Sequence, residues 1–140
     1  MKTKLWIRIA SVLMFLHTVG HSFGTFNKNT PNKKIAEILE QMAQNHFDFM
    51  GRNASLGIFF LGYGVVLILF LLLSSLLLWF VSTEAETSLG RKLLLLSTFF
   101  LVGLTVLEII YCFPFFLTLP AAICTGVAYF KVGKQGKLST

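Results

Sequence analysis

The sequence predicts an all-α fold: a four-helix transmembrane bundle with an additional amphipathic surface helix between spans one and two. Three observations predict it. The 140-residue chain is 55% hydrophobic, whereas soluble domains are about 45 to 50% apolar. Three long stretches, residues 9–27, 53–83 and 93–130, contain almost no charged side chain. A polar segment with helical periodicity follows the first of them. We therefore expect one integral membrane domain over residues 1–140.

The three uncharged stretches accommodate four membrane crossings. A crossing needs roughly 20 apolar residues to traverse a hydrocarbon core of about 30 Å, so the first two stretches hold one crossing each. The third holds two, because Cys112-Phe113-Pro114 lies near its middle, and proline removes a helical donor and clashes with the preceding turn. The expected spans are residues 5–24, 54–80, 93–111 and 115–130.

The first stretch has an alternative interpretation as a secretory signal peptide, because Lys2 and Lys4 precede an apolar run. Arg8 and His17 interrupt that run, and residues 21–24 lack a small-x-small cleavage pattern. We therefore expect a span that is retained. Arg8 is close enough to its cytoplasmic end to extend into the headgroup region and anchor the helix.

The formal net charge of +6 is compatible with nucleic-acid binding or with membrane orientation. The basic residues gather where spans end and form no continuous patch, so we expect no nucleic-acid partner and apply the positive-inside rule. The three groups that face the cytoplasm in one topology contain Lys2, Lys4, Arg8, Arg91, Lys92, Lys131, Lys134 and Lys137. Trp6 and Trp79 fall at the same predicted interface. The prediction is a multi-pass protein of the bacterial inner membrane with both termini cytoplasmic.

Residues 31–50 predict an amphipathic helix on the outer membrane surface. Thr30 can cap this helix and Pro31 can occupy its first position. Apolar side chains recur at helical spacing on one face, and charged and amide side chains occupy the other. The stripe contains Ile35, Ile38, Leu39, Met42, His46, Phe49 and Met50. The segment is too charged to span the membrane, so we expect it to cover the bundle with its stripe down. The alternative is an ordinary solvated connection.

Glycines crowd the outer half of the second span, at Gly57, Gly62 and Gly64. Gly20 and Gly24 form a similar pair in the first span. Small residues allow two helix backbones to approach closely, and they equally leave room for a ligand. The sequence does not separate these two uses.

Five polar side chains are expected at one depth in the outer half of the bundle: His17, His21, His46, Glu108 and Tyr111. At 1.5 Å per residue, His17 and His21 lie about 18 and 24 Å from the cytoplasmic end of their span, and Glu108 about 22 Å from the end of its own. Tyr111 follows Glu108 by three positions, and His46 lies on the stripe of the surface helix. Glu108 is the expected anchor, because an ionisable group at membrane depth is costly and usually has a partner or a task.

This polar constellation has three interpretations. A carboxylic acid and an imidazole can move protons or orient the polar head group of a lipid-like ligand. Two histidines four residues apart plus a carboxylate also match zinc or iron ligand chemistry. Finally, His17 and His21 can simply hydrogen-bond across helices while a protonated Glu108 packs between them. We favour the ligand or proton pocket; the sequence identifies no cofactor and no catalytic residue.

Two segments carry a family resemblance. Residues 16–24 read Leu-His-Thr-Val-Gly-His-Ser-Phe-Gly, and residues 47–52, Phe-Asp-Phe-Met-Gly-Arg, lead into Phe-Phe-Leu-Gly-Tyr-Gly at residues 59–64. On these segments the chain resembles a family of small, functionally uncharacterised bacterial four-helix membrane proteins. The resemblance covers most of the first 80 residues. It implies four spans and an outward-facing histidine motif, and it implies no activity.

The leading functional hypothesis is an inner-membrane bundle whose outer half holds a small amphiphile or a quinone-like ligand beneath the surface helix. The alternative is a non-catalytic subunit or assembly factor that binds another membrane protein, or a second copy of the chain, through its glycine-rich helix faces. Transport fits less well, because one chain has a single intramembrane carboxylate and no visible inverted repeat.

Overall fold

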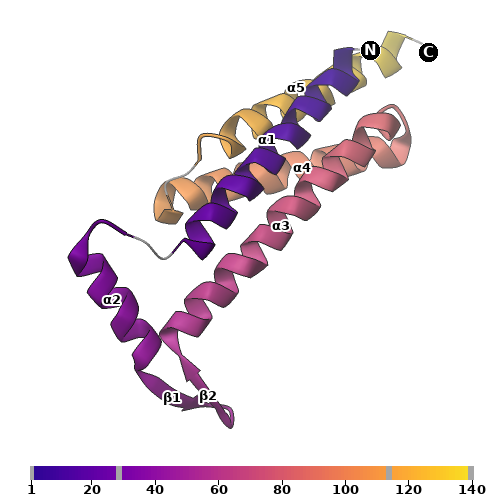
Figure 1. Ribbon diagram of the computed structural model, residues 1–140. Coiled ribbons are helices and arrows are strands. Elements are labelled where there is room, and N and C mark those ends of the chain that lie inside the picture. Colours follow the sequence, from indigo (N-terminus) through magenta and orange to yellow (C-terminus); the bar gives the residue numbers. More distant parts are fainter. Residues whose placement is uncertain (1, 28–29, 113–114, 139–140) are drawn as a thin grey trace. The chain divides into compact units, whose positions relative to one another are not determined.

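The computed structural model describes residues 2–27, 30–112 and 115–138, and most of them are helical (Figure 1). The helices in these ranges are α1 (Lys2–Phe26), α2 (Lys33–Gln44), α3 (Leu56–Glu84), α4 (Ser88–Leu107) and α5 (Thr118–Leu138). A π-helix, η1 (Glu108–Cys112), continues α4. Two short antiparallel strands, β1 (His46–Phe49) and β2 (Arg52–Ser55), separate α2 from α3 along the chain. The helical fold class is therefore confirmed, with a small hairpin that the sequence did not predict.

Three segments are long and apolar enough to cross a membrane: Thr3–Phe26, Leu56–Glu84 and Ser88–Tyr111. They correspond to the first three expected spans. Most of the fourth expected span, residues 115–130, lies in α5, which does not meet the same criterion over the described residues. Lys131 and Lys134 lie inside α5 and shorten its apolar part. The break before α5 is where the sequence predicts it, although Pro114 lies outside the described residues.

The chain divides into two compact units. Residues 1–17 and 71–140 form one unit, which we call the helical unit, and residues 18–70 form the other, which we call the hairpin unit. The helices α1 and α3 each contribute one part to each unit.

Each helix of the helical unit buries one narrow stripe of side chains. The buried positions recur at intervals of three and four residues, the spacing by which helices interlock in left-handed bundles. These positions include Thr3, Ile7, Ala10, Met14 and His17 on α1, Leu71, Ser75, Leu78 and Ser82 on α3, Leu94, Ser97, Leu101, Thr105 and Glu108 on α4 and η1, and Thr118, Ala121, Thr125, Ala128 and Val132 on α5. Many are small, which allows the close backbone approach typical of membrane helices. Large apolar side chains such as Phe99 and Phe130 are exposed instead.

In the helical unit, α1 contacts α3 through two serines. Ser11 Oγ donates to the carbonyl oxygen of Ser75 at 2.8 Å, and Ser75 Oγ donates to the carbonyl oxygen of Ser11 at 2.9 Å. One turn earlier on α1, the Arg8 guanidinium lies 4.7 Å from the centre of the Trp79 ring, a cation–π contact. The two pairs show that α1 and this part of α3 run antiparallel.

The helix α1 also contacts α5, and α5 packs closely along α4. Near the beginning of α1, Lys131 Nζ lies 5.1 Å from the centre of the Trp6 ring. Further along α1, His17 contacts Thr118, the first residue of α5. These pairs make α1 and α5 antiparallel too. The beginning of α1 and the later part of α5 therefore lie at the same end of the helical unit.

The amphipathic helix of the hairpin unit is shorter than the expected 31–50. It is α2, and Asn32, not Thr30, caps it: Asn32 Oδ1 accepts from the backbone N–H groups of Lys34 and Ile35 at 3.1 and 3.4 Å. The apolar stripe persists, with Ile35 and Ile38 exposed. The helical periodicity predicted the apolar stripe correctly, but the helix ends at Gln44.

Residues 46–49 form a strand where a helix was expected. His46-Phe47-Asp48-Phe49 alternates polar and aromatic side chains, the period of a strand, and this alternation prevails over the helical spacing. Met50 and Gly51 follow with φ values of 54° and 79°, the paired positive angles of a tight hairpin turn. The rings of Phe47 and Phe49 lie 6.1 and 5.1 Å from the Phe59 ring of α3, centre to centre. The position of His46 on a helical stripe was therefore wrong.

Candidate functional site: a buried histidine, threonine and glutamate network

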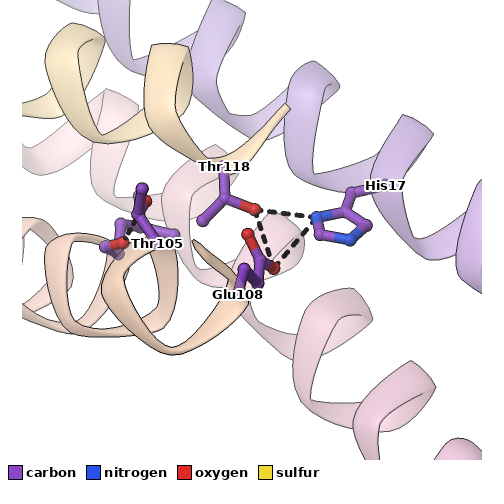
Figure 2. A network of polar contacts seen from close by, with 5 residues as sticks. His17, Thr105, Glu108 and Thr118 are labelled. Carbon is purple, nitrogen blue, oxygen red and sulfur yellow. Dashed lines mark hydrogen bonds and ion pairs between the residues drawn. The ribbon is translucent and has the colours of Figure 1, made fainter. Parts of the chain in front are cut away.

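Three side chains from α1, η1 and α5 form a polar network inside the helical unit (Figure 2). His17 Nδ1 lies 2.8 Å from Thr118 Oγ1, and Thr118 Oγ1 donates to Glu108 Oε1 at 3.0 Å. His17 Nδ1 is also 3.6 Å from Glu108 Oε1. The three residues are only 4%, 0% and 5% exposed, in the order His17, Thr118, Glu108. The network thus joins segments that are far apart in the sequence, and its three side chains are buried in the helical unit.

Local backbone structure positions each member. His17 ends the buried stripe of α1, and Thr118 is the first residue of α5. Glu108 lies where α4 changes into η1, and its backbone N–H is shared between the carbonyl oxygens of Leu104 and Thr105. Short π-helical segments inside helices occur frequently at functional sites. The widened turn at Glu108 is therefore a second local signal that coincides with the buried carboxylate.

The hydrogen-bond directions assign the proton on His17. A threonine hydroxyl has one hydrogen, and Thr118 gives it to Glu108 Oε1. Thr118 Oγ1 must then accept from His17, so Nδ1 of the imidazole carries a hydrogen. Nδ1 is hydrogen-bonded to the hydroxyl at 2.8 Å, and it lies 3.6 Å from the carboxyl oxygen, an ion-pair distance. His17, Thr118 and Glu108 thus form a continuous donor and acceptor chain.

The second carboxyl oxygen of Glu108, Oε2, takes no part in this donor and acceptor chain. Glu108 Oε2 is buried and has no hydrogen-bond partner among the described residues. An unpaired buried acceptor costs about 1 to 3 kcal/mol. Such an atom in a folded protein calls for a proton, a bound water, an ion or a ligand donor. Oε2 is therefore the carboxyl oxygen of the network that lacks a hydrogen-bond partner among the described residues.

The structure brings together two of the five expected site residues, His17 and Glu108. His21 lies in the hairpin unit, where its ring interacts with the backbone of Gly64 and its Nε2 is buried with no partner among the described residues. His46 lies on β1, also in the hairpin unit, and is exposed. Their participation in the Glu108 site stays a prediction.

Tyr111 does not reach the carboxylate. Its side chain is 78% exposed, whereas Glu108 is buried, and the two share no hydrogen bond in the described part of the chain. In a regular α-helix, residues three apart are neighbours on the surface, and the expected contact between Tyr111 and Glu108 depends on that geometry. In the wider turn of η1, the same spacing brings Tyr111 to a different face.

Thr118 is the network member that sequence reasoning missed. The residue follows the proline-containing break and begins the last helix, so it falls near the level of Glu108 once the chain reverses. That position was a usable signal. A hydroxyl is easily overlooked beside ionisable groups because threonine is common in membrane helices, where it often bonds to its own backbone.

The described residues contain no group of three or more histidine, cysteine, aspartate or glutamate side chains positioned to hold a metal ion. The metal interpretation requires two histidines and a carboxylate, and the network contains one histidine, His17, and one carboxylate, Glu108. Comparisons with protein-family models, curated proteins and solved structures found no match. The family resemblance thus stays a prediction, and the network itself is the basis of the functional proposal.

Proposed function

We propose that the chain is a multi-pass inner-membrane protein whose buried His17–Thr118–Glu108 network binds the polar end of a lipid-like or quinone-like ligand. The observation that carries this proposal is the buried Oε2 of Glu108, which has no hydrogen-bond partner among the described residues. A carboxylic acid hidden from water needs a polar partner, and the apolar surroundings favour one attached to a hydrophobic molecule.

The proposed architecture is a four-helix transmembrane bundle in which α5 supplies the fourth crossing. The antiparallel contacts of α1 with α3 and α5, and the close packing of α4 with α5, support it. In this topology both termini are cytoplasmic and Glu108 lies in the outer half of the membrane. The exposed Ile35 and Ile38 of α2 would face the outer membrane surface.

The chemistry of the network suits a ligand that can both donate and accept hydrogen bonds. A quinol or alcohol hydroxyl would donate to the ionised Oε2, and a quinone carbonyl would accept from Oε2 when it carries a proton. The hydroxyl of Thr118 donates to Oε1 and is itself hydrogen-bonded to His17 Nδ1, so Oε1 is held in place. Binding therefore leaves one carboxyl oxygen fixed and the other oriented toward the ligand.

Thermal unfolding of the detergent-purified full chain tests this proposal, with decylubiquinone as the probe and decane-1,2-diol as a simpler amphiphile. We expect at least one of the two to raise the unfolding temperature of the wild type. Glu108→Gln should abolish that increase, whereas Glu37→Gln, the same change on the exposed face of α2, should preserve it. Equal stabilisation of Glu108→Gln and wild type, or no stabilisation by either probe together with a native mass spectrum that retains no lipid or quinone, would refute the proposal.

A second candidate function, a non-catalytic subunit or assembly factor, is favoured by the glycines that remain open. A Cβ atom built on Gly20, Gly24 or Gly62 meets no described residue within 4 Å apart from its own stretch of helix backbone, so these positions leave space for a partner helix. A Cβ on Gly57 would meet the backbone of Ala43 at 3.0 Å, so Gly57 already serves packing within the hairpin unit. Gly62→Leu should then abolish co-purification of a membrane partner or of a second, differently tagged copy, while Glu108→Gln should leave it intact.

A further inference from the structure

A cleft in the helical unit lies at the opposite end of α4 from Glu108. It has a volume of about 350 Å³ and is lined by the turn after α3, the first two turns of α4 and one residue of α5. The lining residues are Glu86, Ser88, Arg91, Lys92, Leu95 and Tyr129. At 1.5 Å per residue, Arg91 and Glu108 are about 25 Å apart along the helix axis. The cleft is thus separate from the network.

The charges of the cleft lack internal compensation. Arg91 and Lys92 form no ion pair with any described residue, Glu86 included; the ion pair found in the described ranges is His17 with Glu108. The guanidinium of Arg91 extends toward α5, where Gly133 leaves room for it: a Cβ on that glycine would lie 3.7 Å from Nη2. Two cations against one carboxylate leave a net positive cleft.

The remaining lining groups add hydrogen bonding and an apolar wall. Ser88 and Tyr129 contribute hydroxyl groups, and Leu95 contributes an apolar side chain one turn further along α4. The cleft also includes the beginning of α4, where the helix dipole favours negative charge. Its end of the unit carries Trp6 with Lys131, and Arg8 with Trp79, pairs typical of a membrane interface.

We infer that this cleft binds the phosphate of an anionic phosphate ester, with Arg91 and Lys92 as the charged contacts and Ser88 and Tyr129 as hydrogen-bond donors. Paired basic residues between membrane helices suit such groups. The apolar wall and interfacial surroundings suit a phospholipid head group; a soluble phosphate ester offers the same phosphate chemistry. Glu86 opposes binding by its charge.

Titration of the detergent-purified full chain distinguishes these sources. The probes are dihexanoyl phosphatidylglycerol, its phosphatidylcholine counterpart, which has no net charge, and glycerol 3-phosphate. We expect phosphatidylglycerol to bind more tightly than phosphatidylcholine, and the double variant Arg91→Gln/Lys92→Gln to weaken its binding by roughly thirtyfold. Lys34→Gln/Arg52→Gln, which removes the same charge from the hairpin unit, should change the affinity by less than about twofold.

Glu86→Gln guards against a loss caused by misfolding, because it should tighten binding by about threefold through removal of a neighbouring negative charge. Tight binding of glycerol 3-phosphate with the same variant pattern would support the site and identify a soluble ester as its source. The inference is overturned if the wild type binds neither phosphatidylglycerol nor glycerol 3-phosphate. It is also overturned if Arg91→Gln/Lys92→Gln binds these probes as tightly as the wild type does. Neither result bears on the Glu108 proposal, because the cleft lies about 25 Å from Glu108 along the helix axis and shares no lining residue with the network.

Discussion

His17 Nδ1 lies 3.6 Å from Glu108 Oε1, and the hydroxyl of Thr118 bridges the two groups. The contact joins the first and third apolar helices through the first residue of α5. Removal of one partner of a buried ion pair or hydrogen bond strongly destabilises the folded protein, because the other partner stays buried without compensation. The helical unit should therefore be sensitive to each member of the network.

Replacement of Thr118 by valine tests the bridge. The change keeps the shape of the side chain but removes the hydroxyl that both His17 and Glu108 contact, so we expect a loss of about 1 to 3 kcal/mol of unfolding free energy. Unfolding of the purified chain by dodecyl sulfate, followed by circular dichroism, measures it. Thr105→Val is the matched control. Thr105 is equally buried, but its hydroxyl donates to Leu101 of its own helix, so this change should cost less than about 0.5 kcal/mol. Equal effects would contradict the bridging role.

The serine pair between α1 and α3 should be stabilising, and its two members should be energetically coupled. Ser11 and Ser75 each donate to the other's backbone carbonyl, so each alanine substitution removes a separate hydrogen bond. We expect about 0.5 to 1.5 kcal/mol for each single variant, within the range of hydrogen bonds between membrane helices. A double-mutant cycle in the same unfolding assay should give a coupling energy of about 0.5 kcal/mol or more, because the two hydroxyls are only 3.4 Å apart and residues in contact are not additive. No loss in either single variant would argue against this contact.

The hairpin turn makes a prediction about backbone conformation. Gly51 has φ of 79°, which a β-branched residue adopts only with strain, so Gly51→Val should open the hairpin. Met50 has φ of 54° and is 90% exposed. Met50→Asn should therefore keep the hairpin, because asparagine tolerates this region. Hydrogen exchange of the amides in residues 46–55, read by mass spectrometry, should accelerate in the first variant only. Unchanged exchange in Gly51→Val would contradict the turn.

Two glycines of α3 should respond differently to enlargement. A Cβ on Gly57 would meet the Ala43 backbone at 3.0 Å, whereas Gly62 has open space. Gly57→Ala should therefore loosen α2 from α3 and accelerate amide exchange over residues 33–44. Gly62→Ala should leave that exchange unchanged, and its higher helix propensity favours α3 slightly. Similar exchange in the two variants would mean that Gly57 does not hold α2.

The sequence predicted the apolar helices well because hydrocarbon imposes a simple requirement on length and composition. The ranges of α1, α3 and α4 overlap the expected spans, and α5 begins at Thr118, after the expected break. The hairpin was missed because its residues satisfy two periodicities at once. His46, Phe49 and Met50 fit a helical stripe, but Phe47 and Phe49 alternate as in a strand, and contact with Phe59 favours the strand.

The candidate site was predictable only in part. Depth counting along straight helices was sufficient to pair His17 with Glu108, because both positions depend on the rise per residue alone. The environment of Tyr111 depends on which way a side chain points around the helix, and a single π turn changes that direction. Thr118 could not be paired from periodicity, since its position depends on how the chain reverses between η1 and α5.

The most direct test of the central claim is solid-state NMR of the full chain in lipid bilayers. Histidine is labelled with ¹⁵N and glutamate with ¹³C, and His17→Asn and Glu108→Gln assign the signals. We expect His17 to carry its hydrogen on Nδ1 and to show a dipolar coupling to the Glu108 carboxyl carbon that disappears in Glu108→Gln. A His17 ring without hydrogen on Nδ1, or without coupling to any glutamate carboxyl carbon, would contradict the account.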